Sequence, residues 1–411
     1  MRTITIFLLL MFIHVSIVFA ELRYNGGIAL VSSYDNNIYL SSDHEKEDYR
    51  NILNVDLAAI SETAIQNFNA NYSLNFNKFW RYQDNDYIGH TFGIDFERNI
   101  TRHLLFTFSD SYYLSEEPLE QDPEITALRR QRNRYVRNRA DVGLSYQFGR
   151  ENLLTMSYLD SRLQNRSSDV EDSVEYGPII NLNYWINMHH GVELGYSWNR
   201  IEYEEEPPIK RDTIITAYNY RLNPHTLASI HYSLEFFHAY DEIDYNNHIV
   251  TVGLEHSFSH RWSLSGSVGE FFWDPERGDS ENGFVYELRL RRNFERSSVT
   301  ASGSGGSREE LTDAESRGFI KYNTLALTLS HDLTARTTLA LEGSYHHEKT
   351  VSREFQRDDI WTFRGGISHR LLHWLQCSFD LEQRERNSSN PDREYRNFMA
   401  MIRFQGNYER R

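Results

Sequence analysis

Nine short polar segments recur along the chain at a nearly constant spacing, and they divide most of it into ten similar units. Their centres lie 36 to 38 residues apart, except for one interval of about 50 residues between residues 100 and 150. The segments are Ser61-Glu62-Thr63, Asn99-Ile100-Thr101, Gly149-Arg150-Glu151, Asn187-Met188-His189, Asn223-Pro224-His225, Ser259-His260, Glu295-Arg296, Leu333-Thr334-Ala335 and Leu371-Leu372-His373. So regular a spacing predicts one supersecondary unit repeated along the chain.

Each unit holds two stretches of about 12 residues in which apolar and polar side chains alternate. A period of two residues is typical of a strand with one face in water. Ile88, Phe92 and Phe96 fall on one side of such a stretch, whereas Gly93 and Glu97 fall on the other. We therefore expect a sheet with one apolar face and one polar, charged face.

The connections between stretches alternate between short turns and longer loops. The longer ones are residues 35–49, 115–134, 163–171, 202–210, 239–247, 274–283, 304–317, 348–357 and 386–394. Bacterial outer-membrane barrels have an even number of strands, short periplasmic turns and long extracellular loops. The sequence thus predicts an all-β, transmembrane, antiparallel up-and-down β-barrel of roughly 20 strands over residues 21–411. Gly303-Ser304-Gly305-Gly306 resembles a flexible loop, which leaves 18 strands as the alternative.

Composition separates this prediction from its rivals. The mean hydropathy of −0.63 is typical of a soluble protein, but 14% of the residues are aromatic and they gather on one face of the expected strands. A barrel is apolar only on alternate residues and carries aromatic girdles, so it accounts for both observations. Propeller blades need four short strands each, and helical solenoids need a period of 3.6. A soluble secreted β-protein is the remaining alternative.

The N-terminus predicts export. Arg2 precedes an apolar run from Ile4 to Phe19, and small or short residues at Val18-Phe19-Ala20 are typical of a signal-peptide cleavage site. We expect residues 1–20 to be removed near Ala20 and the rest to be integral to the bacterial outer membrane. The chain contains one cysteine, Cys377, so the sequence predicts no disulfide framework.

The segment Ser33-Tyr34-Asp35-Asn36-Asn37-Ile38-Tyr39-Leu40-Ser41-Ser42-Asp43, followed by Asp48-Tyr49, carries a family resemblance. It resembles the start of the exosortase (PEP-CTERM) system-associated outer-membrane β-barrels of the β-barrel porin-2 type, although Asn36 stands where Asp is more usual. The specific part covers about 20 residues. The resemblance implies an outer-membrane location near surface-polysaccharide and protein-sorting systems, and it implies no established substrate.

The long interval between residues 100 and 150 contains a third loop that begins acidic and ends basic. If this loop folds inward, its charges and the start of the next strand form a pore constriction; otherwise it is an ordinary surface loop. The candidate constriction residues are Glu116, Glu117, Glu120, Arg129, Arg130, Arg132, Arg137 and Arg139.

About 20 strands enclose a lumen too wide for side chains alone to fill. The residues expected on its wall include charges of both signs, namely Asp141, Glu287, Arg289, Arg291, Arg364, Asp380, Glu382 and Arg384. These charges either suit polar solutes or pair across strands to stabilise a wet wall. Centring the last hairpin turn on Leu371 and Leu372 predicts that Arg364 lies opposite Asp380 and Thr362 opposite Glu382.

Other chemistry is sparse. Acidic runs in the first loop and around Glu204 either bind Ca²⁺ or form solvated faces. The histidines lack the spacing of a metal site, and no nucleophile-elbow or haem-attachment motif is present. The sequence therefore predicts no catalytic residue, metal or cofactor, and the net charge of −16 argues against nucleic-acid binding.

Three function classes follow from these observations. The first is a porin-like channel or export pore for hydrophilic material, associated with surface polysaccharide or exosortase-type systems. The second is a sheath that holds a partner such as a periplasmic export component or a secreted cytochrome. The third is an outer-membrane enzyme or adhesin. Expected partners are outer-membrane lipid and lipopolysaccharide, the barrel-assembly machinery and, for an export pore, polysaccharide or a periplasmic partner.

Overall fold

The computed structural model describes residues 22–118, 132–166, 171–204, 207–239, 244–310, 318–351 and 356–410. The expected signal peptide, residues 1–20, lies outside these ranges. The strands are β1 (Leu22–Asp35), β2 (Asp48–Glu62), β3 (Gln66–Phe79), β4 (Tyr87–Asn99), β5 (Leu104–Ser115), β6 (Tyr135–Phe148), β7 (Asn152–Asn165), β8 (Ser173–Trp185), β9 (His190–Tyr203), β10 (Ile209–Asn223), β11 (Thr226–Ala239), β12 (Tyr245–Ser259), β13 (Trp262–Pro275), β14 (Glu281–Asn293), β15 (Ser297–Glu310), β16 (Gly318–Thr334), β17 (Thr337–Thr350), β18 (Arg357–Arg370), β19 (Leu375–Ser388) and β20 (Tyr395–Arg410). Two 3-10 turns, η1 (Gln83–Asn85) and η2 (Pro391–Arg393), complete the described elements. No helix in these ranges is long and apolar enough to cross a membrane.

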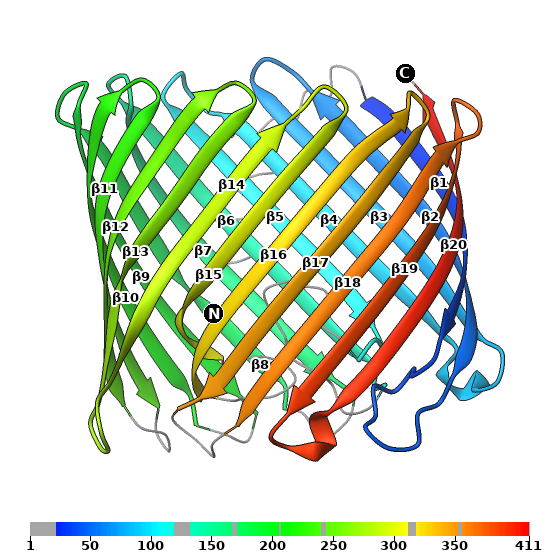
Figure 1. Ribbon diagram of the computed structural model, residues 1–411. Helices are drawn as coiled ribbons and strands as arrows, with labels where there is room; N and C mark the ends of the chain where they lie inside the picture. Colours follow the sequence, from blue (N-terminus) through cyan, green and yellow to red (C-terminus); the bar gives the residue numbers. More distant parts are fainter. Residues whose placement is uncertain are drawn as a thin grey trace.

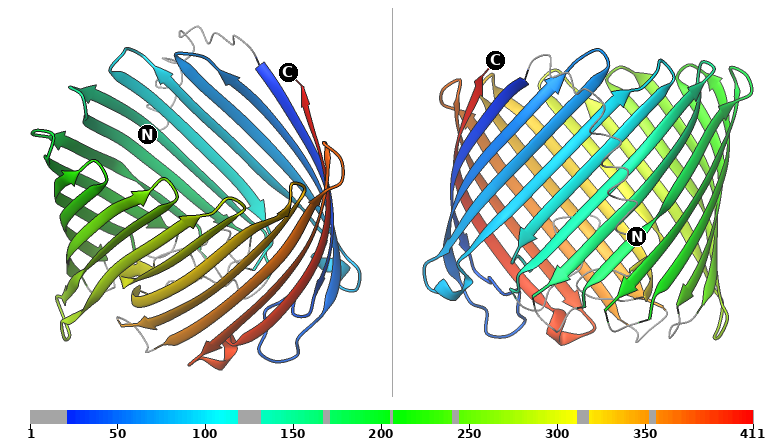
Figure 2. Two further views of the ribbon diagram at one scale, coloured as in Figure 1. Left: turned by 45° about the horizontal axis from the view of Figure 1, so that its top comes forward. Right: turned by 180° about the vertical axis from the view of Figure 1, so that it is seen from behind.

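All 20 strands form one closed antiparallel barrel (Figures 1 and 2). Each strand pairs with its neighbour in the sequence, and β1 pairs with β20 to close the ring, for example at Ile28 opposite Gly406. Closure leaves no sheet edge whose backbone groups would need partners in a lipid environment. The predicted all-β up-and-down barrel is confirmed, and the alternative of 18 strands is wrong.

The two faces of the barrel follow the alternation in the sequence. On β14, Phe284 and Leu288 point outward and are 61% and 52% exposed, whereas Glu287 lies on the opposite face. The inner face is identified by contacts between strands that are not neighbours, such as Tyr245 on β12 with Phe319 on β16. The side-chain alternation continues unbroken from strand to strand in the pairing registers, so one set of alternate residues on each strand points outward, and most of this set is apolar.

Outward aromatic residues gather near both ends of the strands. Near the short turns, Phe258 stacks on Trp262 with ring centroids 4.6 Å apart. Near the long loops, Tyr345 and Trp361 lie 4.3 Å apart. Rings at these two levels are typical of the girdles that flank the apolar band of an outer-membrane barrel.

The nine polar segments identified in the sequence all lie at short turns, which form the upper rim in Figure 1. The two chain ends of the barrel, the start of β1 and the end of β20, lie at the same rim (Figure 1). The strand ends that the ten longer connections join lie along the opposite rim. We refer to these as the short-turn end and the long-loop end.

The segment Gly303-Ser304-Gly305-Gly306 is part of strand β15, so its interpretation as a loop is wrong. Gly305 lies opposite Tyr286, and a Cβ atom at Gly305 would stand 2.5 Å from the Tyr286 ring. The ring therefore covers the glycine backbone and supplies the packing that a glycine side chain cannot. The sequence-based prediction was wrong here because glycine has a low strand propensity by itself, and propensity does not include packing by an aromatic residue on the neighbouring strand.

Candidate functional site: the lumen and its long-loop mouth

The inner wall of the barrel is rich in small polar side chains. On β3, the inward residues Asn69, Asn71, Ser73 and Asn75 alternate with outward apolar ones. On β15, the inward positions are Ser298, Thr300, Ser302 and Ser304. Amide and hydroxyl groups exchange hydrogen bonds with water readily, so a wall of this composition suits a lumen filled with water and polar solutes.

All the charged residues predicted for the wall lie on the inner face. Asp141 is on β6, the residues from Glu287 to Arg291 are on β14, Arg364 is on β18, and Asp380, Glu382 and Arg384 are on β19. The cross-strand neighbours of Arg289 are Ser265 and Ser302, so this arginine does not face a carboxylate. Charge pairing across strands thus explains part of the wall and fails on β14.

The predicted register of the last hairpin was wrong by two residues. Arg364 lies opposite Glu382, and its Nε donates to Glu382 Oε2 at 3.1 Å. Thr362 faces Arg384, whereas Asp380 faces Gly366 and accepts a hydrogen bond from Ser378 Oγ at 2.9 Å. The error arose because the connection comprises residues 371–374, four residues centred beyond Leu372, so each pair of opposed residues shifts by two while remaining on the same face.

Both described stems of the third loop contact the inner wall. Glu117 accepts hydrogen bonds from Arg50 on β2, from Arg132 Nη2 at 3.0 Å and from the Tyr87 hydroxyl at 2.8 Å. The Arg132 guanidinium also lies 4.8 Å from the centre of the Phe79 ring. Arg50, Phe79 and Tyr87 occupy inward positions of β2, β3 and β4, so the loop stems turn into the lumen.

The structure brings only some of the predicted constriction residues together. Glu116 pairs with Arg134 at 3.2 Å, and Glu117 pairs with Arg132, whereas Arg137 and Arg139 lie on the wall of β6. Glu120, Arg129 and Arg130 lie outside the described residues. Sequence reasoning missed Arg50 and Tyr87, which are far from the loop in sequence and are placed beside it by strand pairing.

The electrostatic setting of Glu117 holds it ionised. Burial by itself would raise the pKa of this carboxyl. The guanidinium groups of Arg50 and Arg132, together with the Tyr87 hydroxyl, outweigh burial and lower the pKa from an ordinary 4.5 to about 2. A permanent negative charge between two arginines therefore fixes the loop stems to the wall over the physiological pH range.

A second inward element is the hairpin end formed by the last residues of β15 and the first of β16. Pairing between β14 and β15 stops at Gly305, while β15 and β16 remain paired to Glu310 and Gly318. Figure 1 shows the corresponding bend at the lower end of β15. Glu309 accepts a hydrogen bond from the Tyr245 hydroxyl of β12 at 2.9 Å. The hairpin end therefore leaves the wall and crosses the inner side of β12 to β14.

An apolar patch on the inner wall receives this hairpin end. Phe319 is 0% exposed, stacks on Trp273 at 4.9 Å and meets Tyr245 at 5.6 Å. The patch consists of Ile201, Ile209, Phe237, Ala239, Tyr245, Phe271 and Trp273. Its sequence signal is the appearance of apolar residues at inward positions near the long-loop ends of β9 to β13, where the alternation otherwise places polar ones.

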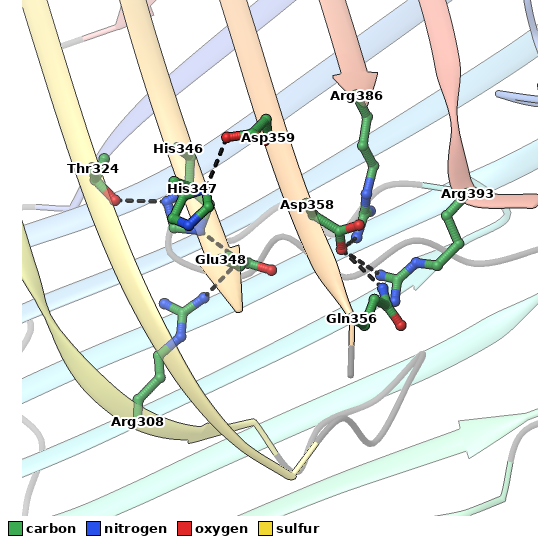
Figure 3. Close-up of polar contacts among 10 residues, drawn as sticks. All are labelled: Arg308, Thr324, His346, His347, Glu348, Gln356, Asp358, Asp359, Arg386 and Arg393. Atoms are coloured by element: carbon green, nitrogen blue, oxygen red, sulfur yellow. Dashed lines mark hydrogen bonds and ion pairs between the residues drawn. The ribbon is translucent and has the colours of Figure 1, made fainter. Parts of the chain in front are cut away.

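Buried ion pairs secure the same end of the lumen (Figure 3). Asp358 is 1% exposed and accepts a hydrogen bond from Arg386 at 2.6 Å, and Arg393 of η2 lies 3.5 Å away. Glu348 contacts Arg308 at 3.4 Å and also His346. These contacts connect β15 to β17, and β18 to β19 and the last loop.

The segment that carries the family resemblance lies where the barrel closes. Asp35 accepts hydrogen bonds from the Asn37 backbone at 2.8 Å and from Asn397 Nδ2 at 2.6 Å. Asn36 Oδ1 accepts one from the Phe398 backbone at 2.6 Å. Because Asn397 and Phe398 belong to β20, this segment joins the first loop to the last strand.

The described residues contain no group of three or more His, Cys, Asp or Glu side chains that could hold a metal ion. Within the first loop, the Glu47 carboxylate pairs with Arg81 at 2.6 Å. Its pKa is lowered by hydrogen bonds from Tyr34 and Arg81. The Glu47 carboxylate therefore already has an ion pair with Arg81 and a hydrogen bond from Tyr34.

Comparison with known proteins extends this picture. No protein-family model and no curated protein matches the sequence. Among solved structures, the siderophore receptor PirA of Pseudomonas aeruginosa matches 94% of this chain and 80% of its own, with a TM-score of 0.53 and 10% identity. A variant of the ferric enterobactin receptor PfeA of the same organism matches 95% and 81%, with a TM-score of 0.55 and 8% identity. The chain has the fold of an outer-membrane β-barrel. Pseudomonas aeruginosa OccK3 (OpdO) aligns over 97% of this chain and 99% of its own, at 14% identity and a TM-score of 0.46.

Proposed function

We propose that this outer-membrane barrel is a porin-like channel or export pore for hydrophilic material. The observation that carries the proposal is the inner wall, where hydroxyl, amide and charged groups face the lumen of a closed barrel of 20 strands. Barrels of 16 to 18 strands already enclose an aqueous channel. A wall that hydrogen-bonds to solutes lowers the cost of stripping their hydration as they pass.

The long-loop end is the narrow part of the proposed pathway. The third-loop stems fixed by Glu117 and the hairpin end fixed by Phe319 both reduce the opening there. Their partners lie on opposite parts of the ring, β2 to β4 and β12 to β13. In this proposal the candidate constriction consists of these two inward elements, with Arg137 and Arg139 on the adjoining wall.

The finer assignment rests on the resemblance in the first loop. We propose that the transported material is associated with surface polysaccharide or an exosortase-type system, and that residues 1–20 are a signal peptide. The outer apolar face would contact lipid and lipopolysaccharide after insertion by the barrel-assembly machinery, with the short turns in the periplasm. The proposal gives the chain no catalytic role, metal, cofactor or nucleic-acid partner.

Purified protein in planar lipid bilayers tests the proposal. We expect stable unitary conductance steps, and we expect passage of small sugars when the protein is reconstituted into liposomes and osmotic swelling is followed. A lipid-only preparation and a refolded barrel with few strands provide the controls. Folded protein that is silent in bilayers, fails to pass sugars and copurifies with a partner in its lumen would support the sheath instead.

A further inference from the structure

Six arginines at the short-turn end of β13 to β18 share one property. None of them forms an ion pair within the part of the chain that the structure describes. Three lie on the inner wall and three at the turns: Arg289, Arg291 and Arg370 on the wall, and Arg261, Arg296 and Arg336 at the rim. We call this group the arginine sector.

Backbone hydrogen bonds join the neighbouring hairpins that carry the arginine sector. The Arg261 carbonyl accepts a hydrogen bond from the Asn293 backbone at 2.7 Å, and the Arg296 carbonyl accepts one from Asp332 at 2.7 Å. The Arg370 backbone donates to the Arg336 carbonyl at 2.8 Å. Rim arginines on one hairpin are therefore hydrogen-bonded to the next hairpin, and the row continues onto the wall through β14.

Arginines at the long-loop end, in contrast, form ion pairs with carboxylates. Arg50 and Arg132 share Glu117, and Arg386 and Arg393 share Asp358. In the arginine sector, the wall neighbours of Arg289 and Arg291 are serine and threonine. Arg291 faces Ser263 and Thr300, and its Nε donates a hydrogen bond to Asn293 Oδ1 at 3.3 Å. Four carboxylates lie at the same end of these strands, Glu287, Glu295, Asp332 and Glu342, and Glu342 already pairs with Arg364 at 3.5 Å.

Such a group of like charges does not stabilise the barrel. Arg289 and Arg291 are two residues apart on one strand face, a separation of about 7 Å, so they repel each other. Serine at both positions would complete a neutral hydroxyl wall with its neighbours. Exposed arginines without an ion pair among the described residues can instead bind an external anion, which neutralises their charge.

We propose that the arginine sector binds a linear anionic polymer, such as a carboxylate-bearing polysaccharide, and admits it into the lumen from the short-turn end. The row extends from the rim onto the wall, which fits an extended chain carrying repeated charges better than a folded acidic protein, whose contacts would stop at the rim. Bidentate contacts from guanidinium groups suit carboxylates. This inference rests on the proposed channel for its route and names the class of material that enters it.

Binding is tested separately from transport, with full-length protein in nanodiscs and fluorescently labelled oligogalacturonate of eight units. We expect fluorescence anisotropy to report binding that weakens as salt rises above the ionic strength at which the screening length is about 10 Å. Neutral maltooctaose should not compete, and monomeric galacturonate should compete at least about tenfold less well, because a single carboxylate engages fewer arginines.

Two variants distinguish the wall from the rim. Arg289→Gln with Arg291→Gln removes two wall charges, and Arg261→Gln with Arg296→Gln removes two rim charges. Each pair should weaken binding at least about fivefold. Arg102→Gln with Arg150→Gln removes the same charge from short turns elsewhere and should leave binding unchanged.

The outcomes separate this inference from the proposed channel. Oligogalacturonate binding without bilayer conductance would contradict the channel and leave the anion site in place. Conductance without binding would overturn the anion site alone. Binding lost in the rim variant but unchanged in the wall variant would also overturn the inference, because it indicates docking of an acidic partner at the rim. If monomeric galacturonate competed as well as the octamer, the site would bind a small anion, and the inference of a linear polymer would be wrong.

Discussion

At the scale of single residues, the lumen uses charge in two ways. Glu117 and Asp358 are each held by two arginines at the long-loop end, whereas Arg289 meets serines on both sides. Removing one member of a buried pair leaves an uncompensated charge, which costs more than the pair contributes. Residues at the long-loop end thus act mainly by fixing loops.

Glu117→Gln should release the third-loop stems. The substitution leaves Arg50 and Arg132 without their counter-charge, and we expect a local loss of about 2 kcal/mol. Hydrogen exchange of residues 116, 117 and 132–134 should accelerate, whereas the exposed Glu47→Gln should leave these residues unchanged. Because the pKa of Glu117 falls from 4.5 to about 2, its contribution is complete above pH 4.5 and disappears as the pH falls through about 2. Release already at pH 4 would contradict this assignment.

Arg364 offers a test of register. In a double-mutant cycle, Arg364→Ala and Glu382→Ala should show a small coupling of at most about 1 kcal/mol, because the Arg364 side chain is half exposed in a wet lumen. Arg364→Ala and Asp380→Ala should be additive, since Asp380 lies opposite Gly366. Unfolding in urea from lipid vesicles measures both cycles. Coupling to Asp380 with additivity toward Glu382 would restore the register expected from the sequence.

At the scale of elements, the sequence predicted what depends on local pattern and missed what depends on distant contacts. The nine short turns, the alternation on each strand and the inner position of the predicted charges all follow from period and turn chemistry. The inward end of β15 and β16 did not, because Phe319 is buried by residues of β12 and β13 that lie at least 44 positions earlier. The same limit hid Arg50 as the partner of Glu117.

Phe319→Ala should free this hairpin end. Truncating a fully buried phenylalanine costs about 3 to 5 kcal/mol, and here the loss falls on one element and not on the whole barrel. We expect faster hydrogen exchange at residues 318–322 and a larger, noisier unitary conductance. Phe284→Ala, on the outer face of β14, is the matched control and should change neither. Unchanged conductance with faster exchange would remove the hairpin end from the solute pathway.

At the scale of the whole molecule, three features fit an outer-membrane channel: the closed ring of strands, the two chemically different faces of the sheet, and the distribution of charge along the lumen. Closure of β1 on β20 satisfies the backbone, the outer face is apolar between two aromatic levels, and the inner face is polar. The arginine sector lies at the short-turn end, whereas the arginines paired with Glu117 and Asp358 fix the long-loop end. The two ends of the lumen are therefore chemically different, which suits a pathway with a defined direction.

Orientation follows from the two kinds of connection. Epitope tags at Gly278 or Ser389, in long-loop connections, should be detected by antibody on intact cells. Tags at Arg150 or Asn223, at short turns, should be detected only after the outer membrane is permeabilised. Immunofluorescence under both conditions measures this. Surface detection of the short-turn tags would invert the barrel and place the arginine sector outside the cell.

Thiol labelling of adjacent residues tests the wet lumen and lipid-facing exterior most directly. In a Cys377→Ser background, Glu287→Cys and Leu288→Cys differ by one position on β14 and point to opposite faces, as do Asp380→Cys and Phe379→Cys on β19. We predict that a charged, water-soluble thiol reagent modifies the cysteines at 287 and 380 in membranes, and that a lipid-soluble maleimide alone modifies those at 288 and 379. Reversed labelling, or no aqueous access to 287 and 380 in folded protein, would contradict a water-filled lumen.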